Sequence, residues 1–146
     1  MKIYIGSDHA GFKLKEKLKP FLIKYKVQDL GNLIYNKNDD YPVYGLKVAK
    51  AVSKNKNSIG ILVCGSGQGV AIAANKVKGI RAAVAENVRD AFLAKNDDNV
   101  NVICLPGRYT KLILAKKIIN KFLETKFSKA KRFTRRVNEI KKIEKP

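Results

Sequence analysis

The chain of 146 residues is long enough for one domain with one substantial hydrophobic core. Its hydrophobic content of 45% is typical of globular proteins, and no apolar run is long enough to cross a bilayer. The first residues lack the long apolar segment and cleavage site of a signal peptide. We therefore expect a soluble cytoplasmic protein without a membrane partner.

The charge is strongly one-sided, with 31 Lys and Arg residues against 12 Asp and Glu residues and a formal net charge of +19. Such a balance is found in proteins that bind nucleic acids. Here the lysines are spread along the whole chain, and no RNA-binding aromatic motif, zinc-finger spacing or helix-turn-helix pattern accompanies them. We expect a basic surface that attracts anionic metabolites, and we do not expect nucleic acid as a partner.

Patterns typical of strands and of helices alternate from the first residues onwards. Residues 2–7 predict a strand, and residues 11–25 an amphipathic helix in which Pro20 predicts a kink or an early end. Residues 26–31 predict a short second strand, and residues 32–42 a polar loop.

The middle of the chain contains the strongest strand pattern. Residues 43–54 predict a helix, and residues 58–65 (SIGILVCG) predict a strand that is apolar on both faces. Such a strand is typical of the centre of a parallel sheet covered by helices. Residues 68–77 predict a tight helix of small residues.

The same alternation continues to the end of the chain. The pattern predicts strands over residues 79–86 and 99–107 and helices over residues 87–96, 111–124 and 133–145. Five strands alternating with helices predict a single α/β domain: a three-layer α/β/α sandwich around a five-stranded parallel sheet, Rossmann-like in architecture.

Ligands of such sheets bind beyond the carboxyl ends of the strands. The residues that follow each predicted strand are Asp8–His9, Asp40–Tyr41, Cys64–Gly69, Glu86–Asn87 and Pro106–Arg108. We expect the functional site to be built from these segments.

Three glycines, Gly65, Gly67 and Gly69, follow the central strand and precede a helix. Glycines permit a tight turn, and N–H groups at the start of a helix attract an anion or a developing oxyanion. Dinucleotide binding is an alternative, because Glu86 lies at the distance of a ribose-binding acid; however, the spacing is G-x-G-x-G rather than G-x-G-x-x-G. A purely structural turn is the other alternative.

Two side chains beside these segments are candidates for chemistry. A thiol at the start of a helix, as expected for Cys64, has its thiolate stabilised and becomes a usable base or nucleophile, although a small buried hydrophobe is the alternative. His9 is the only histidine, and its place at a strand end favours contact with a ligand. Cys104 lies inside a predicted strand, so we expect it in the core as a second reduced thiol.

Three stretches together resemble the B-type ribose-5-phosphate isomerases, a family that also includes allose-6-phosphate and galactose-6-phosphate isomerases. They are GSDHAGFKLK at residues 6–15, DYP at 40–42 and CGSGQGVAIAANKVKGIRAA at 64–83, and the likeness extends to RRVNEI at 135–140. The resemblance implies reversible conversion of ribose 5-phosphate and ribulose 5-phosphate without metal or cofactor. It also implies a homodimer or tetramer with shared active sites, in which the C-terminal helix, about residues 128–144 of the single domain 1–146, packs on a neighbouring subunit.

The resemblance also assigns roles to individual residues. Cys64 would be the general base of a cis-enediolate mechanism, since Val70 stands where some members have a glutamate, and Ser66 would assist the thiol. The enediolate oxygen would be held by the backbone of Gly65, Gly67, Gln68 and Gly69. Asp8 would hold sugar hydroxyls and Tyr41 would line the pocket. The phosphate would be clamped by His9, Arg132, Arg136 and, from the neighbouring subunit, Arg108; a solvated basic helix face is the alternative for the two later arginines.

One departure from the family pattern concerns ring opening. The family's H-N-D-x-N-V motif, whose histidine opens the sugar ring, corresponds here to residues 97–102, so that Asp97 replaces the histidine and Asp98 the asparagine. A shifted alignment would put Lys95 there. A carboxylate opens a ring only if it holds a proton near neutral pH. We therefore keep three hypotheses: Asp97 is a substitute acid–base, the enzyme depends on the open-chain sugar, or the chain is one subunit type of a mixed assembly.

Two alternatives to a ribose-5-phosphate isomerase remain at this point. One is an isomerase of a hexose 6-phosphate, either allose or galactose 6-phosphate. The other is a protein that binds sugar phosphates or nucleic acids without catalysis.

Overall fold

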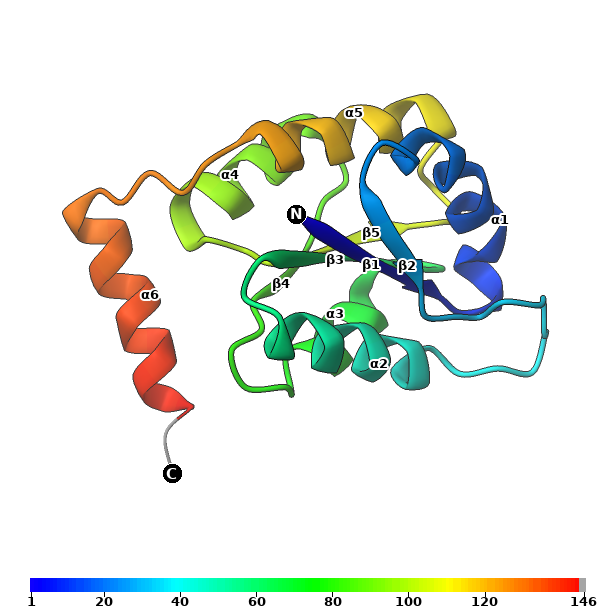
Figure 1. Ribbon diagram of the computed structural model, residues 1–146, viewed down its shortest axis with the longest axis horizontal. Coiled ribbons are helices and arrows are strands. Elements are labelled where there is room, and N and C mark those ends of the chain that lie inside the picture. Colours follow the sequence, from blue (N-terminus) through cyan, green and yellow to red (C-terminus); the bar gives the residue numbers. More distant parts are fainter. Residues whose placement is uncertain (145–146) are drawn as a thin grey trace.

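The structure is a computed structural model that describes residues 1–144. Its centre is a sheet of five parallel strands in the order β2-β1-β3-β5-β4 (Figure 1). The strands are β1 (Lys2–Ser7), β2 (Lys26–Asp29), β3 (Ser58–Cys64), β4 (Ala82–Val84) and β5 (Val102–Pro106). β2 is added on one side of β1 and β3 on the other, so the strand order switches between β1 and β3. Ligands of such sheets bind at this switch point.

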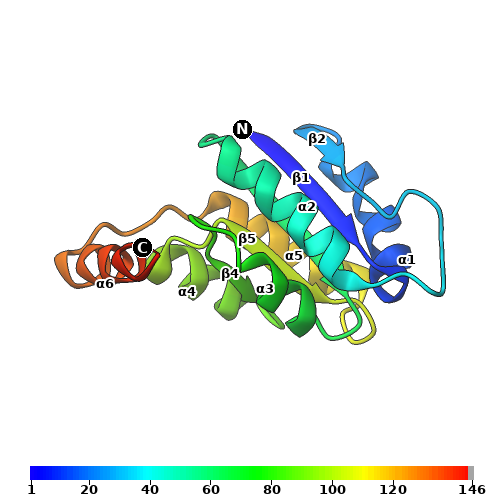
Figure 2. The ribbon, with the colours of Figure 1, turned by 90° about the horizontal axis from the view of Figure 1, so that it is seen from below.

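Helices cover both faces of the sheet, as Figures 1 and 2 show. One core cluster packs α1 (His9–Leu18), α4 (Val88–Asp98) and α5 (Leu112–Glu124) against one face. The other packs α2 (Tyr41–Lys54) and α3 (Gln68–Ala74) against the opposite face. The expected three-layer α/β/α sandwich is therefore confirmed.

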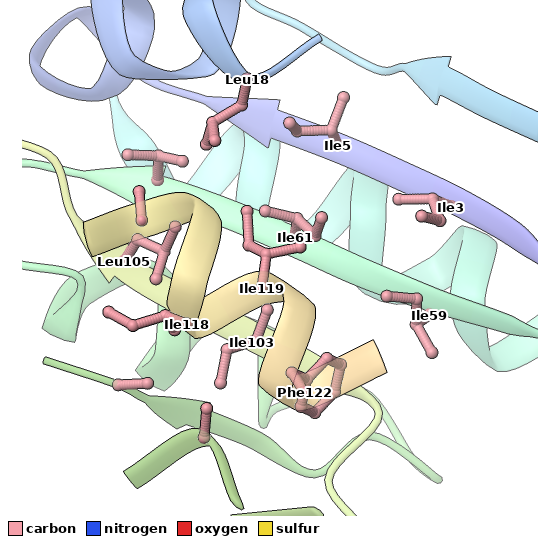
Figure 3. Packing of buried hydrophobic residues seen from close by; sticks show 14 of the residues in the cluster. Ile3, Ile5, Leu18, Ile59, Ile61, Ile103, Leu105, Ile118, Ile119 and Phe122 are labelled. Carbon is pink, nitrogen blue, oxygen red and sulfur yellow. The ribbon is translucent and has the colours of Figure 1, made fainter. Parts of the chain in front are cut away.

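The central strand is buried along its whole length, as its apolar pattern predicts. Ile59 and Ile61 point to the layer of α1 and α5, where they meet Ile119 and Phe122 (Figure 3). Cys64 belongs to the cluster of the opposite layer. Alternation along a strand thus sends successive side chains into two separate cores, which explains why both faces read as apolar.

Some boundaries differ from the sequence expectation at helix starts and ends. The first helix ends at Leu18, and Pro20 begins a 3-10 helix, η1 (Pro20–Leu22), because proline cannot continue the α-helical hydrogen bonds. The second helix begins at Tyr41 rather than residue 43, because a proline is favourable in the first turn of a helix, where its missing N–H costs nothing.

Further differences lie near the last two strands. The fourth and fifth strands are shorter than expected, and α4 extends to Asp98 instead of ending at residue 96. Asn99 ends α4 in the left-handed conformation, and the Arg81 guanidinium donates to its carbonyl at 2.8 and 2.9 Å. These bonds stabilise the carbonyl end of the longer helix.

The last helix, α6 (Lys131–Ile143), begins two residues earlier than expected, and residue 145 of the expected range lies outside the described residues. It lies beyond α4 at one end of the molecule, while α1 lies at the other end (Figures 1 and 2). Phe133 and Val137 are its buried residues. Within residues 1–144, every helix is too short or too polar to cross a membrane.

Candidate functional site

A cleft of about 220 Å³ lies at the carboxyl ends of the strands. It is lined by Asp8, His9, Ala10, Tyr41, Cys64, Gly65, Ser66, Gly69, Arg108 and Tyr109. These residues come from segments that follow β1, β3 and β5 and from the start of α2. The structure therefore gathers eight of the residues singled out from the sequence at one place.

Cys64 ends β3 at the floor of this cleft and is only 3% exposed. The Gly67 N–H donates to the Cys64 sulfur at 3.1 Å. A backbone N–H donor therefore lies directly against the sulfur. Gly67 makes the contact from the left-handed conformation, with φ of 76°. Cys104, as expected, is fully buried, and its burial raises the pKa of its thiol.

Two N–H groups of the glycine turn form hydrogen bonds within the turn itself. The Gly67 N–H serves Cys64, and the Gln68 N–H donates to the Ser66 hydroxyl at 3.3 Å. In this conformation the Gly67 N–H contacts the thiol and Gln68 lines a neighbouring cleft. That the N–H groups of the turn hold a substrate oxygen stays a prediction.

The turn after β5, at Gly107 and Arg108, is hydrogen-bonded to the backbone where the glycine turn begins. The N–H groups of Gly107 and Arg108 donate to the carbonyls of Cys64 and Gly65 at 2.7 and 3.1 Å. The Arg108 guanidinium lies over Gly65, where an added Cβ would be 3.1 Å from its nearest nitrogen. Arg108 thus reaches the cleft of its own chain. Its position supports a role in its own chain, whereas the resemblance assigns this role to the Arg108 of a neighbouring subunit.

Tyr41 forms another wall of the cleft. Its ring packs directly on Gly69, where an added Cβ would lie 2.6 Å from the ring carbons. The proline that follows Tyr41 places this residue in the first turn of α2 rather than in a loop. The aromatic ring therefore lies on a rigid element beside the thiol.

Asp8 lies between β1 and α1 and is 5% exposed. Its carboxylate caps α1 by accepting the Gly11 N–H at 3.0 Å. Burial raises the pKa of Asp8, and the nearby Asp39 adds to this, while the bond from Gly11 and the neighbouring His9 oppose it. The carboxyl group is thus held at the cleft in a partly desolvated position.

Asp39 is a site residue that the sequence reasoning missed. Its carboxylate lies 2.9 Å from the His9 Nδ1, accepts the His9 N–H at 2.7 Å and accepts the Asn32 side-chain amide at 2.7 Å. Sequence reasoning placed the neighbouring Asp40 at the strand end, but Asp40 is exposed. Only the pair of adjacent acids before Tyr41 hinted at Asp39, and strand-end counting cannot choose between them.

A second cleft of about 260 Å³ adjoins the first through Ser66 and Tyr109. Gln68, Glu86, Pro106 and Thr110 complete its lining. Glu86 therefore lies beside the expected site. α3 begins at Gln68, so Gly69 lies in its first turn. The spacing remains G-x-G-x-G, and the dinucleotide alternative gains no support from this placement.

Four expected site residues do not join the cleft within the chain. Asp97 and Asp98 lie in the last turn of α4, which leads toward the start of β5 at the opposite edge of the sheet. Asp97 accepts the Asn96 amide at 2.7 Å, and Asp98 lines a groove beside α6. Arg132 and Arg136 lie on α6 itself (Figure 1). If these residues act on a substrate bound near Cys64, a second copy of the chain must supply them.

The chemistry available in the cleft is proton transfer beside an anion. A thiol with an N–H donor at its sulfur is a base, and Arg108 with His9 supplies cations for an anionic substrate. Asp8 offers carboxylate oxygens for hydroxyl groups. A small hydroxylated molecule that carries an anionic group matches this arrangement.

Comparisons with known proteins agree with this chemistry. A family model described as Ribose/Galactose Isomerase matches residues 3–140. A probable ribose-5-phosphate isomerase B of Mycoplasma genitalium is 42% identical over 146 residues, which cover 98% of this chain and 95% of that protein. Ribose-5-phosphate isomerase B of Clostridium thermocellum is 44% identical, with a TM-score of 0.94 and coverage of 99% and 97% of the two chains. The Mycoplasma genitalium enzyme with bound ribulose-5-phosphate is 41% identical, with a TM-score of 0.94 and coverage of 98% and 95%.

Proposed function

The chain belongs to the ribose/galactose isomerase family, and from this premise we propose that it interconverts ribose 5-phosphate and ribulose 5-phosphate. The reaction passes through a cis-enediolate, with Cys64 as the general base, and needs neither metal nor cofactor. The observation that carries the proposal is the Gly67 N–H held on the Cys64 sulfur at the floor of the cleft.

The proton transfer follows from the position of the thiolate. Cys64 removes the proton from C2 of the open-chain aldose, and the electrons of that bond form the enediolate while the C1 oxygen becomes negative. The proton of the C2 hydroxyl passes to the C1 oxygen, and the thiol returns its proton to C1, which gives the ketose with its carbonyl at C2. Because the sulfur keeps the Gly67 N–H as a donor, its negative charge is stabilised before the proton is taken.

We assign substrate binding to the side chains that line the cleft around the thiol. Arg108 and His9 bind the phosphate, Asp8 holds sugar hydroxyls, and the Tyr41 ring covers the sugar from the side of α2. The Ser66 hydroxyl assists at the enediolate. These roles use side chains of a single chain.

The remaining expected residues require an assembly of at least two chains. We infer a homodimer in which α6 of one chain packs on its neighbour and brings Arg132 and Arg136 to the neighbour's phosphate, while α4 brings Asp97 and Asp98 to its sugar. This inference is supported by the position of all four at the far edge from their own Cys64. In this arrangement Asp97 is the substitute for the ring-opening histidine. The two reduced thiols fit a cytosolic location.

The test is turnover of ribose 5-phosphate by the purified chain, followed as ketose formation with and without EDTA. We expect activity that EDTA leaves unchanged and that Cys64→Ala lowers by about 10³-fold, within the range of a lost general base. The matched control is Cys104→Ala, which removes the other thiol and retains turnover. Absence of ketose formation by the wild-type chain would overturn the proposal.

A hexose 6-phosphate is the second candidate substrate, because the matching family includes galactose isomerases and the ring-opening position departs from the pattern. The same assay with allose 6-phosphate and galactose 6-phosphate separates the two. A kcat/KM for either hexose that exceeds the value for ribose 5-phosphate would reassign the substrate.

A further inference from the structure

The only histidine of the chain is fixed at two points by one carboxylate oxygen. The Asp39 Oδ1 accepts the His9 backbone N–H at 2.7 Å and lies 2.9 Å from the imidazole Nδ1. A carboxylate can only accept, so Nδ1 carries the hydrogen. The other ring nitrogen, Nε2, is then the one available to the cleft that His9 lines.

Asp39 is itself held from the sheet. Its second oxygen accepts the Asn32 amide at 2.7 Å, and the Asn32 oxygen accepts the Ser7 hydroxyl at 3.3 Å. The Asn32 N–H also donates to the Ser7 carbonyl at 2.8 Å. Ser7 and Asn32 are buried, and the Asp39 side chain is 6% exposed. A continuous series of hydrogen bonds therefore runs from the end of β1 to the imidazole.

We propose that Asp39 is the positioning residue of His9, which it holds as an imidazolium with Nε2–H directed at the phosphate of the bound sugar phosphate. This inference rests on the proposed function for the identity of the anion, but the pairing itself does not. Asp39 does not itself line the cleft; it acts through His9, which does.

The charges around His9 favour the cation. Asp39 from the loop and Asp8 from the end of β1 are acidic, whereas Arg108 is the basic residue that lines the same cleft. Tyr41 from α2, Cys64 from β3 and Tyr109 from the turn after β5 are the titratable groups that complete the cleft lining. The hydrogen bond that His9 donates to Asp39 raises the pKa of His9, burial opposes this, and Asp8 adds to the increase. The imidazole thus stays charged to a higher pH than a free histidine.

A single histidine makes the test direct, because the imidazole signals in an NMR pH titration need no assignment. We expect the wild-type midpoint to lie above 6.5, and Asp39→Asn to lower it by about one pH unit, a tenfold change in proton affinity. Asp39→Glu keeps the negative charge and restores a higher midpoint. Asp40→Asn removes the adjacent exposed carboxylate and leaves the midpoint in place.

Binding and kinetics give readouts that a merely structural role would not move. Inorganic phosphate shifts the wild-type imidazole signals, and Asp39→Asn requires about tenfold more phosphate for the same shift. With ribose 5-phosphate, Asp39→Asn raises KM about tenfold at pH 8 and less at pH 6, while kcat stays within about twofold. Glu139→Gln, which removes one exposed negative charge on α6, leaves both constants unchanged.

Two results would overturn the inference: a midpoint that Asp39→Asn leaves unchanged, or a loss in kcat without a change in KM. If Asp39→Asn does not fold, Asp39→Glu carries the comparison, since a midpoint equal to that of free histidine in that variant would also reject the pairing. If the titration and phosphate results hold but the wild-type chain converts no sugar phosphate, the proposed function fails and the positioning role stands.

Discussion

At the scale of single residues, the cleft depends on places where a side chain would not fit. The Tyr41 ring packs against Gly69, and the Arg108 guanidinium packs against Gly65. Gly67 adopts a left-handed conformation, from which its N–H contacts the Cys64 sulfur. Each glycine therefore has its own physical reason. The turn is built to bring a ring, a cation and an N–H donor to one thiol.

Substitution of Gly67 tests the strain and the crowding separately. An added Cβ at Gly67, with φ of +76°, would lie 3.1 Å from the Leu105 carbonyl carbon, whereas at Gly79, with φ of +82°, it would meet open space. We expect Gly79→Ala to cost about 1 kcal/mol of unfolding free energy from the left-handed backbone alone. Gly67→Ala costs more, by about 1 to 3 kcal/mol for overpacking, and lowers isomerase activity. Urea unfolding of both variants measures the difference, and equal losses would contradict the crowding argument.

Substitution of Gly69 tests the wall formed by Tyr41. An alanine methyl would lie 2.6 Å from the ring, so the ring must move away from the cleft. We expect Gly69→Ala to lower kcat/KM for ribose 5-phosphate by about 10²-fold, the effect of a misplacement of roughly 1 Å. The double variant Gly69→Ala with Tyr41→Ala removes the clash and recovers part of the loss if binding through the ring is weak. A Gly69→Ala enzyme with wild-type kcat/KM would show that the ring position does not matter.

At the scale of elements, a buried ion network joins α1 to β2. Lys15 is fully buried on α1, and its ammonium contacts Glu16 and Asp29 at 2.5 Å each, while Lys19 contacts Asp29 at 3.1 Å. Asp29 also accepts the Gly31 N–H at 3.0 Å. The network holds the edge strand β2 against α1, the helix whose first residue is the cleft residue His9.

Removal of Lys15 leaves the partly buried Asp29 carboxylate with Lys19 and the Gly31 N–H as its remaining partners. We expect Lys15→Met to lower the unfolding free energy by about 3 kcal/mol at pH 7, the low end of the cost of breaking a buried ion pair. Lys17→Met, on the exposed face of the same helix, is the matched control and changes stability by about 0.5 kcal/mol or less. Similar losses in both variants would reject the network as a stabilising element.

The same network predicts the direction of the pH dependence. Burial works to raise the pKa of Asp29, but the hydrogen bonds from Lys15, Gly31 and Lys19 outweigh it and lower the pKa. A folded pKa below the unfolded value of about 3.9 gives stability that is present above that pH and lost as the pH falls through the folded value. Lys15→Met should therefore be most destabilising at neutral pH and less so near pH 3. Urea unfolding at both pH values measures this, and an effect that grows toward pH 3 would contradict it.

At the scale of the whole molecule, the expected site residues fall into two separate regions of the folded chain. The thiol cleft lies at the carboxyl edge of the sheet, whereas α6 with Arg132 and Arg136 lies beyond α4 at the far end. Glu144, which follows α6 directly, connects this helix to the turn before β4 by accepting the Gly79 N–H at 2.9 Å. An active site that uses both ends requires two chains.

Mixed assemblies test this division. Cys64→Ala and the double variant Arg132→Ala with Arg136→Ala should each be inactive alone, and co-refolding them should restore activity. If chains pair at random in dimers with shared sites, half of the dimers are mixed and each has one complete site, so about a quarter of wild-type activity returns. Analytical ultracentrifugation of the mixture checks that dimers form. No recovery from dimers of both variants would place each active site within one chain.

The sequence alone determined the order of the elements and which segments follow the strands. Helices that bury one face repeat their apolar residues with the helical period, and strands buried on both faces are continuous apolar runs. These patterns depend on which faces are buried and hardly at all on the details of packing. The glycines after β3 and the residues after β1 and β5 could be assigned to one edge because parallel strands all end there. The cleft around Cys64 was predictable for this reason.

Only the tertiary structure decided the contacts between segments distant in the sequence. That Asp39 rather than Asp40 reaches His9 depends on how residues 31–40 return over the end of β1, which no local pattern records. That Arg108 lies at the cleft of its own chain depends on the hydrogen bonds between two turns. The separation of Asp97 and Arg132 from Cys64 follows from the path of α4 and α6 away from the site. Periodicity reports which face of an element is buried, whereas the partners of a polar side chain are set by the three-dimensional path of the whole chain.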